Sequence, residues 1–139
     1  MTTTYLIAFV CYGLSALISM LFGAIYLVRS RFMPYHQEAL GKSWQQLDQN
    51  LQALLLGLMR TAGGGLLATG VSVAILLLIP FRAGESWSKY SIPVIGLLCA
   101  IPALYATILI RSRTQARTPV VASSIGVGLI MIGFILSII

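Results

Sequence analysis

PYHQEALGKSWQQLDQNLQALLLGLMRTAGGG, residues 34–65, separates two membrane-length apolar runs and begins the second of them. This stretch contains the only histidine of the chain, two of its three acidic residues and one of its two tryptophans. These residues are His36, Glu38, Asp48 and Trp44. Most of the remaining sequence is apolar or forms short basic connectors, so any site built on water-soluble chemistry must draw on this stretch.

The composition is typical of a membrane protein. The chain has 139 residues, of which 58% are hydrophobic and only 9% are charged, and its mean hydropathy is +0.94. Soluble domains have about a quarter of their residues charged. The net charge of +6 does not indicate nucleic acid as a partner, because the basic residues lie at the ends of apolar runs, where lipid head groups are found. The predicted partners are therefore membrane lipids.

Four apolar runs are long enough to cross a hydrocarbon core of about 30 Å as helices. The predicted crossings are residues 5–28, 57–80, 90–110 and 119–139. Residues 29–56 form the predicted cytoplasmic loop, and residues 1–139 form a single integral membrane domain. The predicted fold is thus an all-α membrane protein, a four-helix transmembrane bundle with an interfacial amphipathic segment leading into the second helix.

Local signals predict where the first two crossings begin and end. Pro34 is expected to end the first crossing and Pro80 the second, because proline lacks an amide donor. Ser43 and Gln46 match a capping box in front of an amphipathic pattern. We therefore expect a helix over residues 44–60 that lies along the interface and continues into the second crossing.

Prolines also mark the third and fourth crossings. Pro102 lies at mid-depth in the third, where it leaves the carbonyl of Leu98 without its usual donor and should bend the helix. Thr118 followed by Pro119 is a favourable helix cap and first position, so the fourth helix should open there.

The distribution of basic residues predicts the orientation. Four crossings place both termini on one side, and only Arg82 and Lys89 of the nine basic residues lie there. The other side holds Arg29, Arg31, Lys42, Arg60, Arg111, Arg113 and Arg117. Because short loops rich in lysine and arginine stay in the cytoplasm, we expect both termini outside a bacterial inner (plasma) membrane.

Small residues recur at helical spacing and predict how the helices pack, since close approach at small side chains drives association in lipid. The first helix has Ala8, Cys11, Ser15, Ser19 and Gly23. The second helix has Gly57, Thr61, Gly64, Ala68 and Ser72. The third has Gly96, Cys99, Ala103 and Ala106, and the fourth has Ala122, Gly126, Gly133 and Ser137. We expect these seams to pack the four helices around one axis. The alternative is that one or two of them form the interface of a homo-oligomer.

One candidate site binds an anion such as a lipid phosphate. Arginine next to three glycines at a membrane boundary offers charge and free backbone amides. The candidate residues are Arg60, Gly63, Gly64, Gly65, Arg29 and Arg111. The simpler interpretation, which we prefer, is that Arg60 extends to the interface and the glycines permit close packing.

A second, weaker candidate for a polar site comprises His36, Glu38 and Asp48. Metal sites need three or four converging ligands, and one histidine without a second cluster does not supply them. We therefore predict a solvated loop with no metal and no cofactor. The acidic residues all lie in connectors or at the interface, which argues against a proton-coupled carrier.

Residues 44–60, WQQLDQNLQALLLGLMR, allow one comparison with known families. The four helices, outward termini and longer first loop resemble the topology of membrane glutathione transferases and prostaglandin E synthases. Their second helix carries an Arg-x-x-x-Ala-x-x-Asn-x-x-Glu run. Here Asn50 is present, but the arginine before it and the glutamate after it are not. The resemblance implies architecture and carries no activity.

The sequence thus favours an accessory or structural role in which the protein binds a lipid, a protein partner or its own copies. One alternative is a membrane enzyme for a lipophilic substrate, with Arg60, His36 and Glu38 at the cytoplasmic rim. A polar cavity reaching Arg60 would favour it. The other alternative is a carrier or channel, which a continuous water path past Tyr12, Ser19 and Thr69 would favour.

Overall fold

The computed structural model describes residues 2–139, which form helices and connectors without a strand. The α-helices are α1 (Thr3–Val28), α2 (Pro34–Leu40), α3 (Gln49–Leu76), α4 (Ser88–Thr114) and α5 (Val120–Ile138). A 3-10 turn at Trp44–Gln46 precedes α3, and a π-helical turn at Leu77–Phe81 extends it. Four of the helical segments are long and apolar enough to span a membrane: Thr3–Val28, Gln49–Phe81, Ser88–Thr114 and Val120–Ile138. The predicted all-α, four-helix fold is confirmed.

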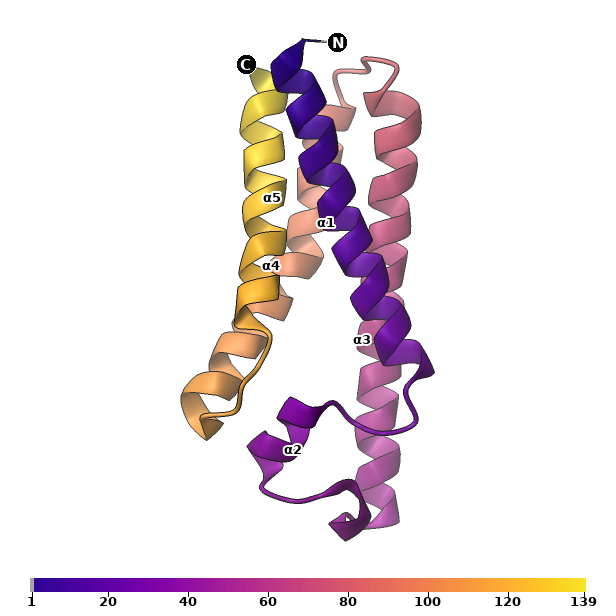
Figure 1. The fold of residues 1–139 in the computed structure, drawn as a ribbon. Helices are drawn as coiled ribbons and strands as arrows, with labels where there is room; N and C mark the ends of the chain where they lie inside the picture. Colours follow the sequence, from indigo (N-terminus) through magenta and orange to yellow (C-terminus); the bar gives the residue numbers. More distant parts are fainter. Residues whose placement is uncertain (1) are drawn as a thin grey trace.

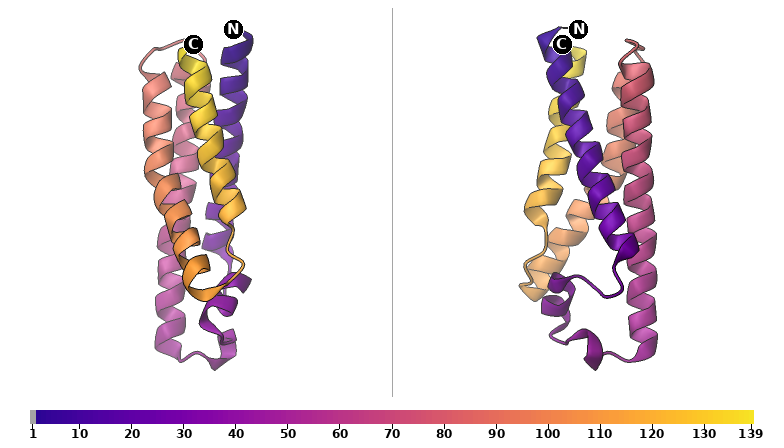
Figure 2. Two further views of the ribbon diagram at one scale, coloured as in Figure 1. Left: turned by 90° about the vertical axis from the view of Figure 1, so that its left-hand side faces the viewer. Right: turned by 45° about the vertical axis from the view of Figure 1, so that its right-hand side comes forward.

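The long helices are grouped differently at the two ends of the bundle (Figure 1). Both termini and the α3–α4 connector lie at one end, the terminal end, as the four-crossing topology predicts. Helix α2 lies at the opposite end, the α2 end. Helix α1 packs against α3 and α5, whereas α4 starts beside α3 at the terminal end and finishes away from it (Figure 2). Pro93 and Pro102 both lie inside α4.

Aromatic side chains fill the bundle at the terminal end. Tyr12, Phe81 and Ile92 are each completely buried. The Phe81 ring stacks on Tyr5 with 4.3 Å between centroids and meets the edge of the Tyr12 ring at 5.6 Å. The π-helical turn brings Phe81 to this position: Pro80 lacks an N–H, and the amide of Arg82 reaches back to the Leu77 carbonyl at 3.2 Å.

The contact between α1 and α3 depends on glycines, but not all of the predicted ones. The seam on α1 is confirmed, with Ser15 and Gly23 buried. On α3 the prediction was wrong: Gly63 faces α1, and Gly57 and Gly64 face open space. A Cβ on Gly63 would lie 2.9 Å from the Gly23 carbonyl oxygen. Helix α3 has small residues on two faces, and spacing alone does not identify the face that α1 covers.

Two boundaries near the first loop differ from the prediction. Helix α1 ends at Val28, so Pro34 does not end it; instead Pro34 is the first residue of α2. The fixed φ of proline suits the first turn of a helix, where its missing amide costs nothing. Helix α2 ends at Leu40, and Gly41 caps it with a φ of 62°, which favours glycine.

The capping signals also act differently from the prediction. The amide of Ser43 donates to Gln46 Oε1 at 2.8 Å, but this capping box closes only the 3-10 turn. Helix α3 begins instead at Gln49, where Asp48 Oδ1 accepts from the amide of Leu51 at 2.9 Å.

Thr118 does not cap α5. Its hydroxyl donates to the Thr107 carbonyl of α4 at 2.8 Å, and α5 begins at Val120. This hydrogen bond joins the beginning of α5 to α4.

Candidate functional site

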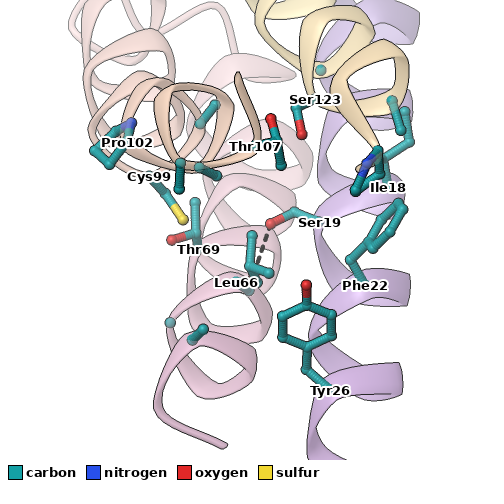
Figure 3. Close-up of a pocket in the computed structure, with 18 of the residues that line it drawn as sticks. Ile18, Ser19, Phe22, Tyr26, Leu66, Thr69, Cys99, Pro102, Thr107 and Ser123 are labelled. Atoms are coloured by element: carbon teal, nitrogen blue, oxygen red, sulfur yellow. Dashed lines mark hydrogen bonds between the residues drawn. The ribbon is translucent and has the colours of Figure 1, made fainter. Parts of the chain in front are cut away.

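A cavity of about 920 Å³ lies between α1, α3, α4 and α5 and extends to α2. Figure 3 shows residues of all four long helices around it, among them Ser19 and Phe22 of α1, Thr69 of α3, Cys99 of α4 and Ser123 of α5. The volume lies within the range of small-molecule sites, roughly 300–1,000 Å³. The cavity is the candidate functional site.

Small side chains make the cavity possible. Among its wall residues are Ala62, Gly65, Ala103, Ala106, Ala122 and Gly126. A Cβ added to Gly65 or to Gly126 would meet no atom within 4 Å, so these glycines border empty space instead of a neighbouring helix. At these positions small residues keep the helices from filling the space between them, in contrast to the close contact at Gly63.

The wall is apolar because several of its hydroxyls donate to the backbone of the helices. Ser19 Oγ donates to the Leu66 carbonyl at 2.7 Å, which Figure 3 shows as a dashed line. Thr107 and Ser15 likewise donate to carbonyls three residues earlier in their helices, each at 2.8 Å. Within residues 2–139, the side chains of Thr69 and Ser123 make no hydrogen bond, so these two hydroxyls are left along the mainly apolar wall between the long helices.

Helix α2 closes the α2 end of the cavity and is attached on two sides. The buried Tyr35 hydroxyl contacts that of Tyr26 on α1, and burial together with this contact raises the pKa of Tyr35. On the other side Glu38 Oε2 accepts from the amide of Arg117, in the α4–α5 connector, at 2.7 Å. Figure 1 shows α2 below the space between the long helices.

His36 lies on α2 and lines the cavity. Its Nδ1 accepts from the amide of Met33 at 3.3 Å, so the neutral ring carries its proton on Nε2. The Tyr35 ring lies 4.4 Å away, centroid to centroid, and Phe32 lies 6.3 Å away. Burial among these rings lowers the pKa of His36, which favours the neutral form near pH 7.

The structure does not bring His36, Glu38 and Asp48 together. His36 borders the cavity, Glu38 attaches α2 to the α4–α5 connector, and Asp48 caps α3. Across residues 2–139, no group of three histidine, cysteine or acidic side chains is placed to hold a metal ion.

The residues of the predicted anion site are also separated. Arg60 is exposed, and its Nη2 donates to the Arg29 carbonyl at the end of α1 at 3.2 Å. Helix α3 runs unbroken through the three glycines: Gly63 packs on α1, Gly64 faces open space and Gly65 lines the cavity.

Arg111 lies exposed in the last turn of α4. An anion site at these residues stays a prediction.

Neither the cavity nor α2 was predicted from the sequence. Proline at the first position and glycine after the last are a helix signal, and Pro34 with Gly41 form that pair within the predicted loop. Cys99 was predicted on a packing seam and Thr69 beside a possible water path, but neither signal indicates a cavity, because isolated small polar residues are common in membrane helices. No signal marks Ser123.

Comparison of the chain with protein-family models, with curated proteins and with solved structures gives no match.

Proposed function

We propose that this protein binds a lipophilic molecule inside the bilayer, and that the cavity is its binding site. The observation that carries this proposal is the chemistry of the wall. Of the described residues that line about 920 Å³, none is aspartate, glutamate, lysine or arginine. Such a wall provides few hydrogen-bonding or charged partners for a polar solute. An apolar molecule that fills the cavity gains dispersion contacts with the wall, which an empty cavity lacks.

Two features favour binding over catalysis or transport. Arg60 does not line the cavity, and the wall is not polar, so the arrangement expected of an enzyme at the rim is missing from the described residues. Towards the terminal end, Tyr12 and Phe81 are fully buried and their rings are in contact, which blocks a water path along the bundle axis. A molecule that enters the cavity therefore has no water path onward to the terminal end.

The proposed setting is a bacterial inner membrane with both termini outside. The basis is the distribution of basic residues, since seven of the nine lie towards the α2 end, in connectors or in the helices next to them. In this orientation the cavity lies in the cytoplasmic half of the bilayer, and α2 separates it from the cytoplasm.

Lipids retained on the purified protein test the proposal. Gly126→Phe places a ring in the cavity. Gly128→Phe is the matched control, because it lies on the same helix and also has open space for a Cβ, but does not line the cavity. Native mass spectrometry in mild detergent should find a lipophile on the wild type and on Gly128→Phe, and less on Gly126→Phe. The double variant Gly65→Phe/Gly126→Phe should retain the least.

Equal retention by all four proteins would contradict the proposal. Loss from Gly128→Phe as well as Gly126→Phe would also contradict it, because it would place the bound lipid on the outer surface of α5.

A further inference from the structure

The α2 end of the cavity defines the kind of molecule that fits. Resting on the proposed function, we infer that the occupant is an uncharged lipid whose carbonyl oxygen accepts a hydrogen bond from His36 and from the hydroxyl pair of Tyr26 and Tyr35. Its hydrocarbon part then extends between the four helices toward Gly96 and Ile130, which also line the cavity.

The charge of the wall excludes an ionised ligand group. A charge moved from water into an apolar site costs several kcal/mol unless an opposite charge or several hydrogen bonds compensate it. Among the lining residues that the structure describes, no permanently charged side chain provides this compensation. Arg60, a candidate for an anionic head group, does not line the cavity; it is exposed, and its guanidinium donates to the backbone carbonyl of Arg29 at the end of α1. The fatty acid anion and the phospholipid head group are therefore poor fits.

His36 provides a hydrogen-bond donor in this otherwise apolar site. Its Nδ1 already accepts from Met33, which leaves Nε2–H as the free donor of the neutral ring. No partner for Nε2 is found within residues 2–139. Burial lowers the pKa of the ring, so at neutral pH it offers a neutral donor and no charge. A neutral donor matches a neutral acceptor such as a carbonyl oxygen.

The two tyrosines add a second donor beside the histidine. When two hydroxyls are in contact, one donates to the other, and the accepting hydroxyl keeps its own proton for a third group. The Tyr35 ring packs against the imidazole, so both donors lie at the same end of the cavity.

The hydroxyls farther along the wall do not compete equally with His36 and the tyrosine pair for the carbonyl oxygen of the ligand. Ser19, Thr107 and Ser15 donate to backbone carbonyls. Thr69 and Ser123 make no hydrogen bond within residues 2–139, but both lie within helices, where a change of rotamer lets the hydroxyl donate to a carbonyl of the preceding turn. Neither His36 Nε2–H nor the tyrosine pair has this option, which places the polar end of the ligand at α2.

A set of probes with matched chains tests the inference on the full-length protein in detergent. Methyl oleate carries a neutral carbonyl, 1-octadecene has no acceptor and oleate at pH 8 is an anion. Methyl oleate should bind about three- to tenfold more tightly than 1-octadecene, the difference expected for one net hydrogen bond. Oleate should bind more weakly than methyl oleate. Diolein and a short-chain prenylquinone then distinguish a glyceride from a quinone as the source of the carbonyl.

Variants separate recognition from packing. His36→Phe should reduce the preference for methyl oleate while leaving the affinity for 1-octadecene unchanged, and His36→Gln, which keeps N–H donors, should retain more of the preference. The double variant Tyr26→Phe/Tyr35→Phe should also reduce the preference, because it removes the second donor. Equal binding of methyl oleate and 1-octadecene by the wild type would overturn the inference. So would an equal loss of both ligands in His36→Phe, or tighter binding of oleate. If Gly126→Phe leaves the binding of every probe unchanged, the proposed function itself fails.

Discussion

The two ends of this bundle use the same residue type in opposite ways. Gly133 and Gly126 lie seven residues, or two turns, apart on one face of α5. A Cβ on Gly133 would lie 2.9 Å from the Tyr12 ring, whereas a Cβ on Gly126 would meet nothing within 4 Å. The first glycine makes room for an aromatic side chain, and the second borders a cavity. A small residue therefore produces contact or space according to the side chain that faces it.

The largest expected difference between the two ends concerns aromatic residues. Tyr12→Ala removes a completely buried ring from the terminal core and should lower the free energy of unfolding by about 3–5 kcal/mol. Phe22→Ala removes a ring from the cavity wall, where part of its surface already faces open space, and should cost less than about 1.5 kcal/mol. Reversible denaturation in mixed micelles measures both. Equal losses would show that the two ends are packed alike.

Substitutions at Gly133 and Gly126 compare the two ends through a smaller change in stability. Gly133→Leu forces a side chain into the Tyr12 ring and should destabilise the protein by about 1–3 kcal/mol. Gly126→Leu has room and also gains helix propensity, so it should match or exceed the wild type in stability. The measurement is the same denaturation series. A destabilised Gly126→Leu would mean that the cavity is closed in the membrane.

Opening of α2 should be separable from unfolding of the bundle. Glu38→Ala removes the acceptor of the Arg117 amide and should speed amide exchange in α2 about fivefold, for a lost hydrogen bond of about 1 kcal/mol. Exchange in the long helices should not change. Glu85→Ala, at the terminal end, is the control. If Glu38→Ala accelerates exchange throughout the chain, α2 is part of the core and not a separate cover.

Acid should also speed amide exchange in α2, by less than Glu38→Ala does. Burial lowers the pKa of His36 below its usual 6.5, so the undocked ring binds a proton more readily than the docked one. The docked state is therefore favoured above pH 6.5 and loses stability as the pH falls from there toward the lowered pKa. Amide exchange in α2, corrected for intrinsic rates, should be faster at pH 5 than at pH 7.5, and His36→Gln should lack this change. The same acid response in His36→Gln would assign it to another group.

Sequence patterns predict the helices of this protein much better than the space between them. Length and hydropathy are properties of single segments. They were enough to predict four membrane-length helices, and Pro80 correctly marked a position near the end of the second. The choice between Gly63 and Gly64 as the residue that faces α1 depends on how α3 is rotated, which spacing does not encode. The cavity depends on the direction of α4 and on side chains from four helices at once, so Thr69, Cys99 and Ser123 became significant only in three dimensions.

Photo-cross-linking inside a bilayer tests the central claim, that the cavity holds a lipophile and the aromatic core at the terminal end does not. The reagent is a neutral monoacyl ester with a diazirine in its chain, added to the protein in lipid nanodiscs. The account predicts that Thr69, Cys99 and Ser123 are labelled and that excess methyl oleate suppresses this labelling. Tyr12 and Ile92 should stay unlabelled, and the lipid-facing Val121, which is 68% exposed, should be labelled without competition. Labelling at Thr69, Cys99 and Ser123 that does not saturate, or that equals labelling at Tyr12, would contradict the account.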